Sequence, residues 1–209
     1  MFEQTLILLL RGEWICHITH PDAYRFLGKD SNRLDAEAFL ARVGRRLTVT
    51  RQGGAWFAAY DQIGPDERKV IREHFADLKN DLRPLVDFFT LVMRAQRQDE
   101  FLAPGTVIES HSLMAAIDAN ASLTTELKAL ARFGKGTVGD GTRGIFDRLL
   151  RKFLEDGYLT LSNAERQVYQ VTGKIEYFQA AMDFLMDHEC VPEELEEDDA
   201  PDGQQELSL

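Results

Sequence analysis

The segment TRGIFDRLLRKFLEDGYLTL, residues 142–161, combines a helix pattern with a strand pattern that follows it directly. On one side of the expected helix 143–156, apolar residues recur at helical spacing, namely Ile145, Phe146, Leu149, Leu150, Phe153 and Leu154. Two β-rich runs, 158–161 and 167–172, then flank a polar turn, which is typical of a hairpin. The segment therefore predicts a helix that leads into a two-stranded hairpin.

The same order occurs earlier in the chain, in RLDAEAFLARVGRRLTVT, residues 33–50. A helix is expected over 33–45, with an inner side made of Leu34, Ala38, Phe39, Ala41 and Val43. A hairpin over 47–60 turns at Gly53 and Gly54. The other expected helices cover 2–11, 21–27, 106–119, 123–133 and 174–188. The order helix, helix, helix, hairpin thus occurs twice, which predicts a mainly α fold with small hairpin wings (α+β): tandem winged helix-turn-helix domains.

A long helical region, expected from Asp66 to Arg97, separates the two units. Its apolar residues recur at steps of three and four: Ile71, Phe75, Leu78, Leu82, Leu85, Phe89 and Val92. This run predicts internal core together with a contact between two copies of the chain. Pro84 lies inside the run and predicts a kink or a break, because proline removes a helical hydrogen bond.

These patterns predict a first domain over 1–64, a helical connector over 65–104 and a second domain over 105–188. Charge sets the remaining 189–209 apart, because nine of the 35 acidic residues and none of the 24 Lys and Arg lie there. We expect this acidic tail to be disordered. It is either a solubilising end, a competitor of DNA, or a segment that docks on a basic partner. The rest of the chain carries only −2, so the low pI does not exclude a basic surface.

The glycine-rich stretch FGKGTVGDGTRG, residues 133–144, contains G-x-G-x-x-G at Gly134, Gly136 and Gly139. A dinucleotide-binding loop needs a strand before the first glycine, whereas LTTELKALARF before it has helical spacing. No G-K-[ST] occurs in the chain, which also excludes a Walker loop. The glycines therefore predict a turn between two helices, and no nucleotide cofactor is expected.

Basic residues gather around this turn. Seven lie between residues 128 and 152, against two acids. Because basic residues before and along such a helix can contact phosphate oxygens, the predicted DNA contacts are Lys135, Arg143, Arg148, Arg151 and Lys152. We expect them to bind the DNA backbone, because the helix has no Asn or Gln to pair with adenine, although arginine can read guanine. A solvated helix face is the competing interpretation.

A smaller basic cluster lies in the first unit, where Arg45 and Arg46 are predicted DNA contacts beside Arg42 and Arg51. Ion pairs with Asp35 or Glu37 are the alternative interpretation of this cluster. Which of the two holds depends on how the helix 33–45 is oriented.

The sequence contains no recognisable catalytic or metal-binding set. Cys16 and Cys190 lie far apart, which is typical of a reducing cytoplasm and argues against a zinc site. His17 and His20 are a weak metal candidate at best. No stretch approaches the ~20 apolar residues of a membrane span. We expect a cytoplasmic protein that is not an enzyme and needs no cofactor.

Two stretches, RGEWICHITHPDAYRFL (residues 11–27) and GRRLTVTRQGGAWFAAY (residues 44–60), resemble the MksE branch of the MukE and MksE group. These are kleisin-interacting tandem winged-helix subunits of bacterial condensins, and the likeness covers most of residues 1–188. It implies a homodimer that binds a kleisin subunit (MksF- or MukF-like) and, through it, an SMC ATPase (MksB- or MukB-like). It also implies a nucleoid-associated protein that contributes to DNA binding, chromosome condensation and segregation, or plasmid defence.

A winged-helix transcription regulator is the alternative hypothesis. It would bind a palindromic site as a symmetric dimer. Two units in one chain and the negative net charge do not favour it. An enzyme or nucleotide-binding protein built around the glycine stretch is a third hypothesis, and it lacks the strand that such a loop requires.

Overall fold

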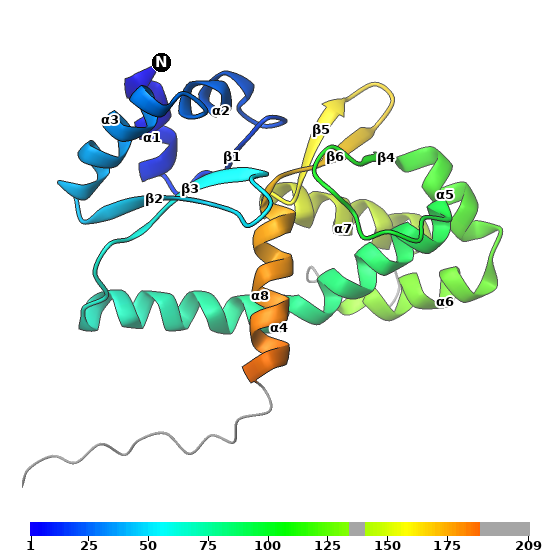
Figure 1. The fold of residues 1–209 in the computed structure, drawn as a ribbon. Helices are drawn as coiled ribbons and strands as arrows, with labels where there is room; N and C mark the ends of the chain where they lie inside the picture. The colour runs from blue at the N-terminus through cyan, green and yellow to red at the C-terminus, as the bar shows by residue number, and fades with distance from the viewer. Residues whose placement is uncertain (134–140, 189–209) are drawn as a thin grey trace, which may run out of the picture.

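The structure is a computed structural model that describes residues 1–133 and 141–188; the glycine stretch around Lys135 and the acidic tail lie outside them. It confirms a mainly helical α+β fold with two small antiparallel sheets (Figure 1). The elements are α1 (Phe2–Leu10), β1 (Ile15–Cys16), α2 (Pro21–Leu27), α3 (Asp30–Ala41), β2 (Arg45–Val49), β3 (Ala55–Tyr60), α4 (Pro65–Gln96), β4 (Val107–Glu109), α5 (Ser110–Asp118), α6 (Ala121–Ala129), η1 (Leu130–Arg132), α7 (Thr142–Glu155), β5 (Leu159–Asn163), β6 (Val168–Val171) and α8 (Lys174–His188).

The two sheets share one topology. Their strand orders are β1-β3-β2 and β4-β6-β5, so the last strand of each unit lies in the middle. Both expected hairpins are present, and each gains a short third strand that the sequence patterns did not predict. The expected helix 106–119 begins only at Ser110, because Val107 and Ile108 pair with β6. Two or three residues are too few to show strand alternation.

The duplication is therefore offset from the predicted order of three helices and a hairpin. The first unit runs α1, β1, α2, α3, β2, β3, and the second runs α4, β4, α5, α6, α7, β5, β6. In chain order, α4 stands before β4 as α1 stands before β1, and the second unit has one more helix between its first strand and its hairpin. The helix that precedes the hairpin is α3 in the first unit and α7 in the second.

In the first unit, α3 packs on the core with its small residues rather than its large ones. Ala36 and Leu40 are fully buried, whereas Leu34 and Val43 are 61% and 49% exposed. The prediction that Leu34, Ala38, Phe39, Ala41 and Val43 form the inner side is therefore wrong, since all five are exposed. Periodicity revealed two apolar stripes on this helix but not which one meets the core.

Helix α4 runs for 32 residues without interruption, so the expected break at Pro84 does not occur. Its axis changes direction where it passes α8 (Figure 1). Pro65 occupies the first turn, and the Glu67 carboxylate accepts a hydrogen bond from the Gly64 amide at 3.0 Å. Leu78, Leu85, Phe89 and Val92 are buried in the core of the second unit, with Phe75 and Leu82 packed against it. Most of the predicted apolar run is thus internal core.

The core of the second unit is rich in aromatic rings. The Phe153 ring of α7 packs against both Phe88 and Phe89 of α4, with ring centroids 4.5 and 5.7 Å away. Phe178 of α8 and Tyr158 pack edge-on against Phe89. These contacts fix α7 and α8 against the second half of α4.

The start of α8 joins the two units (Figure 1). Glu176 is 6% exposed, and its carboxylate accepts hydrogen bonds from the Thr50 hydroxyl at 2.5 Å and the Gly54 amide at 2.9 Å. Beside it, the Tyr177 ring packs at a tilt against Trp14, which packs at a tilt against Phe57. We name this contact between the β2–β3 turn and α8 the joint.

Candidate nucleic-acid interface

Helix α7 carries most of the predicted DNA contacts of the second unit. Gly141 is its N-cap, and the Ile145 amide donates a hydrogen bond to the Gly141 carbonyl at 3.1 Å. The apolar side faces the core as predicted, with Ile145, Phe146, Leu149, Leu150 and Phe153 buried. The basic side chains emerge from the remaining surface of the helix, where their surroundings differ.

Arg143 is held in place by three polar partners. Its Nε lies 3.0 Å from an Asp147 carboxylate oxygen, and its Nη2 donates to Gln167 at 2.8 Å and to Ser110 at 3.2 Å. Arg143 thus links α7 to the start of α5 and to the β5–β6 turn. About two-fifths of the Arg143 side chain remains exposed, so its guanidinium can still approach a phosphate.

Lys152 points toward α4 instead. Its ammonium contacts Asp156 at 2.7 Å and Asp81 of α4 at 3.5 Å. Burial by itself would lower the pKa of Lys152, but the hydrogen bond and charge of Asp156, with help from Asp81, outweigh it and raise the pKa. The positive charge of Lys152 is therefore largely committed within the protein.

Arg148 and Arg151 differ in exposure. Arg148 is half-buried, and its Nε and Nη2 atoms are shielded from solvent. Arg151 is exposed. The charges of Arg143 and Arg151 both act on the Tyr169 hydroxyl of β6, whose pKa is raised by burial and by Asp147. Lys135 lies outside the described residues.

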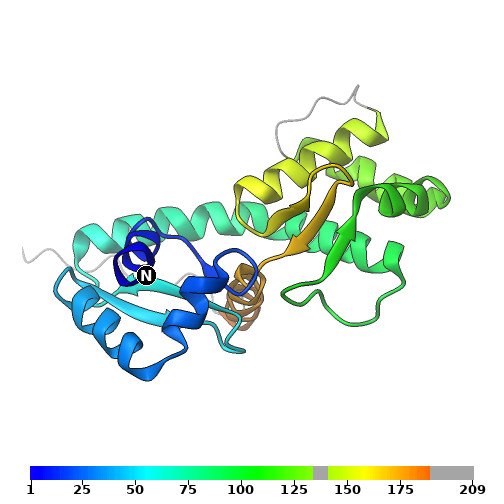
Figure 2. The ribbon, with the colours of Figure 1, turned by 90° about the horizontal axis from the view of Figure 1, so that it is seen from above.

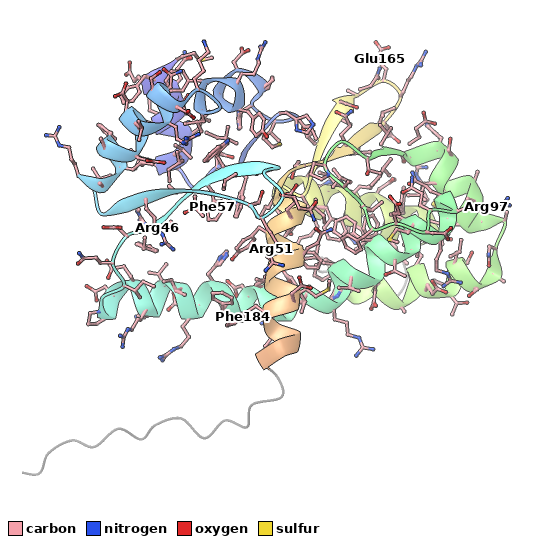
Figure 3. The ribbon with its side chains drawn as sticks, in the orientation of Figure 1. Arg46, Arg51, Phe57, Arg97, Glu165 and Phe184 are labelled. Carbon is pink, nitrogen blue, oxygen red and sulfur yellow. The ribbon has the colours of Figure 1, made fainter. Side chains whose placement is uncertain are left out.

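In the first unit, Arg45 and Arg46 point in different ways, as neighbours on a strand do. The Arg45 guanidinium lies 3.7 Å from the centre of the Tyr60 ring, a cation–π contact. Arg46 is exposed and lies below the hairpin in Figure 3, as does Arg51. Within the described residues, neither Arg46 nor Arg51 pairs with Asp35 or Glu37, so the expected ion pairs do not form. A Glu37 carboxylate oxygen instead lies 3.9 Å from the Arg33 Nε.

Sequence reasoning missed the partners that set the role of each cation. Ser110, Gln167 and Asp81 lie 33, 24 and 71 residues away from the arginine or lysine they contact. Among the partners of Arg143 and Lys152 in the described residues, Asp147 and Asp156 have the helical i,i+4 spacing that the sequence displays. A search for opposite charges at that spacing would have identified Lys152 as partly neutralised.

The buried hydroxyl of Tyr158, on which the charge of Asp156 acts, gives a test at alkaline pH. Burial, with the charge of Asp156, raises the pKa of Tyr158 well above its ordinary value. Above about pH 10 the unfolded chain therefore loses a proton that the folded protein keeps, and stability falls as pH rises. We expect Tyr158→Phe to lessen this fall, measured as the urea midpoint across that range. Equal losses in both proteins would contradict the prediction, and near neutral pH the two midpoints should agree.

The described residues contain neither a cluster of metal ligands nor a helix that could cross a membrane. Across 1–133 and 141–188, no three His, Cys, Asp or Glu side chains converge as a set of metal ligands. No helix in those same ranges combines the length and the apolar character that crossing a bilayer takes.

Comparison with known proteins gives the family. No curated protein sequence matches the chain. The family model for the condensin complex protein MksE matches residues 1–182, which spans both units and most of α8. This confirms the resemblance that the stretches 11–27 and 44–60 indicated. The chain therefore belongs to the MksE family of condensin complex proteins.

Proposed function

We propose that this chain is a non-catalytic accessory subunit of a bacterial condensin-like SMC complex. It binds a kleisin subunit of the MksF or MukF type and, through the kleisin, an SMC ATPase of the MksB or MukB type. ATP hydrolysis then takes place in the partner. The complex acts on DNA at the nucleoid in the cytoplasm, in chromosome condensation and segregation or in plasmid defence.

The observation that carries this proposal is the MksE family match over residues 1–182. The duplicated topology supports its structural part. Each unit places a helix before a hairpin and completes a three-stranded sheet with a short strand. We propose that both units are winged-helix domains, with α3 and α7 in the place where winged helices carry their recognition helix.

Copurification tests the proposal most directly. The tagged chain is recovered from native cells at low salt, with nuclease added so that DNA does not bridge unrelated proteins. A kleisin and a very large coiled-coil ATPase in stable ratio are the expected companions. Recovery of the chain without them, combined with enrichment of one operator from random duplexes, would replace this function with that of a transcription regulator.

We further propose that DNA contact is largely non-specific and backbone-directed. It centres on Arg151 and Arg143 of the second unit, with Arg46 of the first unit and Lys135 contributing. Arg45, Arg148 and Lys152 are secondary contacts, because Arg45 and Lys152 are engaged within the protein and Arg148 is half-buried.

Salt dependence separates these cations. Affinity for DNA falls as salt rises, and Arg151→Ala is expected to make this fall less steep. The slope of log affinity against log salt should shrink in magnitude by about one, because one phosphate contact is lost. Lys152→Ala is the matched control on the next residue and should change the slope much less, since Asp156 and Asp81 hold its charge. The measurement is fluorescence anisotropy with a random-sequence duplex. Identical slopes for the wild type and Arg151→Ala would rule out Arg151 as a contact.

A further inference from the structure

Gln167, at the end of the β5–β6 turn, has a backbone conformation that few glutamines adopt. Its φ is 50°, in the left-handed region that is open to glycine and more often taken by asparagine than by other side chains. Hairpin loops longer than two residues often end in one such residue. Because that conformation does not favour glutamine, the reason for a glutamine at this position lies in what its side chain contacts.

Both the backbone and the side chain of Gln167 are engaged. Its carbonyl accepts a hydrogen bond from the Ser110 amide at 3.2 Å, one step beyond the last β4–β6 pair, Glu109 with Val168. Its side-chain oxygen accepts from the Arg143 Nη2 at 2.8 Å, and the same Nη2 donates to the Ser110 hydroxyl at 3.2 Å. The turn lies beside the starts of α7 and α5 (Figure 2). Gln167, Ser110 and Arg143 thus form a closed ring of hydrogen bonds.

The two supports of this ring are themselves fixed. In the turn, the Arg166 amide donates to the Asn163 side chain at 2.9 Å, and the Ser162 hydroxyl donates to the Val168 carbonyl at 3.0 Å. At the start of α5, Ser110 is fully buried. A residue that its surroundings hold in a rare conformation is strained, and such residues cluster at functional sites. The ring therefore holds the Arg143 guanidinium between two fixed supports.

The amide of Gln167 orients Arg143 without cancelling its charge. Asp147 already lies 3.0 Å from the Arg143 Nε. A carboxylate in place of the amide would give the guanidinium a second negative partner, and the position would then repel phosphate. A neutral acceptor keeps the geometry and leaves the charge of Arg143 opposed by one carboxylate. A guanidinium that is already ordered also loses less freedom when it binds an anion.

We propose that Gln167 is a positioning residue that aligns the Arg143 guanidinium for a DNA phosphate, with Ser110 as the buried support. This inference rests on the DNA contact of the proposed function and deepens it. The β5–β6 turn thereby belongs to the phosphate site, although Gln167 acts only through Arg143.

A double-mutant cycle tests the positioning role in the full chain, with a random-sequence duplex and fluorescence anisotropy at one low salt concentration. Gln167→Met keeps the length of the side chain, removes the acceptor, and is expected to weaken binding by about threefold to tenfold. In the Arg143→Ala background the same change should have no effect, because no guanidinium is left to align. Gln170→Met on β6 is the matched control and should bind like the wild type, since no hydrogen bond of Arg143 within the described residues reaches Gln170.

Gln167→Gly separates positioning from folding. Glycine adopts the φ of this position without strain, so the urea midpoint should stay near that of the wild type. Its affinity for the duplex should nevertheless fall as in Gln167→Met. Either variant binding like the wild type overturns the positioning role, and so does a loss that is equally large without Arg143. If Arg143→Ala binds as tightly as the wild type, the Arg143 contact of the proposed function fails and the positioning role with it, whereas copurification of the kleisin remains a separate result.

Discussion

Replacing Phe153 by alanine is expected to lower the free energy of unfolding by about 3–5 kcal/mol, the largest effect of any single substitution considered for this chain. Phe153 is fully buried, and its ring lies against those of Phe88, Phe89 and Phe133. Three different elements meet at this side chain, so the space that the ring leaves cannot be filled by a small movement of one of them. Urea unfolding followed by circular dichroism measures the loss.

Phe184→Ala is the matched control for this prediction. The Phe184 side chain is 49% exposed and lies at the edge of α8, 6.3 Å from the ring of Phe75. Its removal is expected to cost about 1 kcal/mol or less. Equal losses for the two variants would mean that Phe153 is not the centre of this core.

Replacing Gly173 by alanine is expected to cost about 1–3 kcal/mol and to open the joint between the two units. A Cβ at this position would collide with the Gly54 carbonyl oxygen and would lie 2.8 Å from the Cys16 Cβ. The first of these atoms belongs to the backbone of the β2–β3 turn and cannot rotate away. The turn must therefore move off α8, which weakens the hydrogen bonds between Glu176 and residues 50 and 54.

Amide exchange distinguishes an open joint from general destabilisation. In Gly173→Ala we expect faster exchange at residues 50–56 than the loss of global stability explains, with α7 unaffected beyond that loss. Gly28→Ala is the matched control, because a Cβ there meets only carbonyl oxygens at 3.5 Å or more. Unchanged exchange at 50–56 in a destabilised Gly173→Ala would refute the role of the joint.

The joint also explains how an accessory subunit could present its surfaces in a fixed arrangement. Glu176 lies 126 residues from Thr50, yet their side chains meet in a buried hydrogen bond. Removing the carboxylate would strand the Gly54 amide and the Thr50 hydroxyl, and buried polar groups without partners are costly. The first unit, with α3, and the second unit, with the cations of α7, are therefore held in one packed assembly.

Local patterns predicted much of the fold. The apolar side of α7, the hairpins around residues 50 and 164, and the extent of α4 all follow from periodicity, because burial on one face repeats with the pitch of the element. The pattern failed where an element was too short, as in β1 and β4, or where a helix had two apolar stripes, as in α3. Pro84, for which a kink or a break was predicted, lies inside a helix that changes direction without breaking.

The candidate site, like the fold, could be predicted from the sequence only in part. The order of charged residues along the chain located the cations on α7, and the stretches 11–27 and 44–60 carried the family resemblance. Which cations remain available was decided by partners such as Asp81 and Gln167, and the exposure of Leu34 and Phe39 by the packing of Ala36 and Leu40. The sequence determined the elements and their chemistry because those depend on near neighbours. The tertiary structure alone decided which surfaces are free, because each free surface is what remains after residues distant in the chain have packed together.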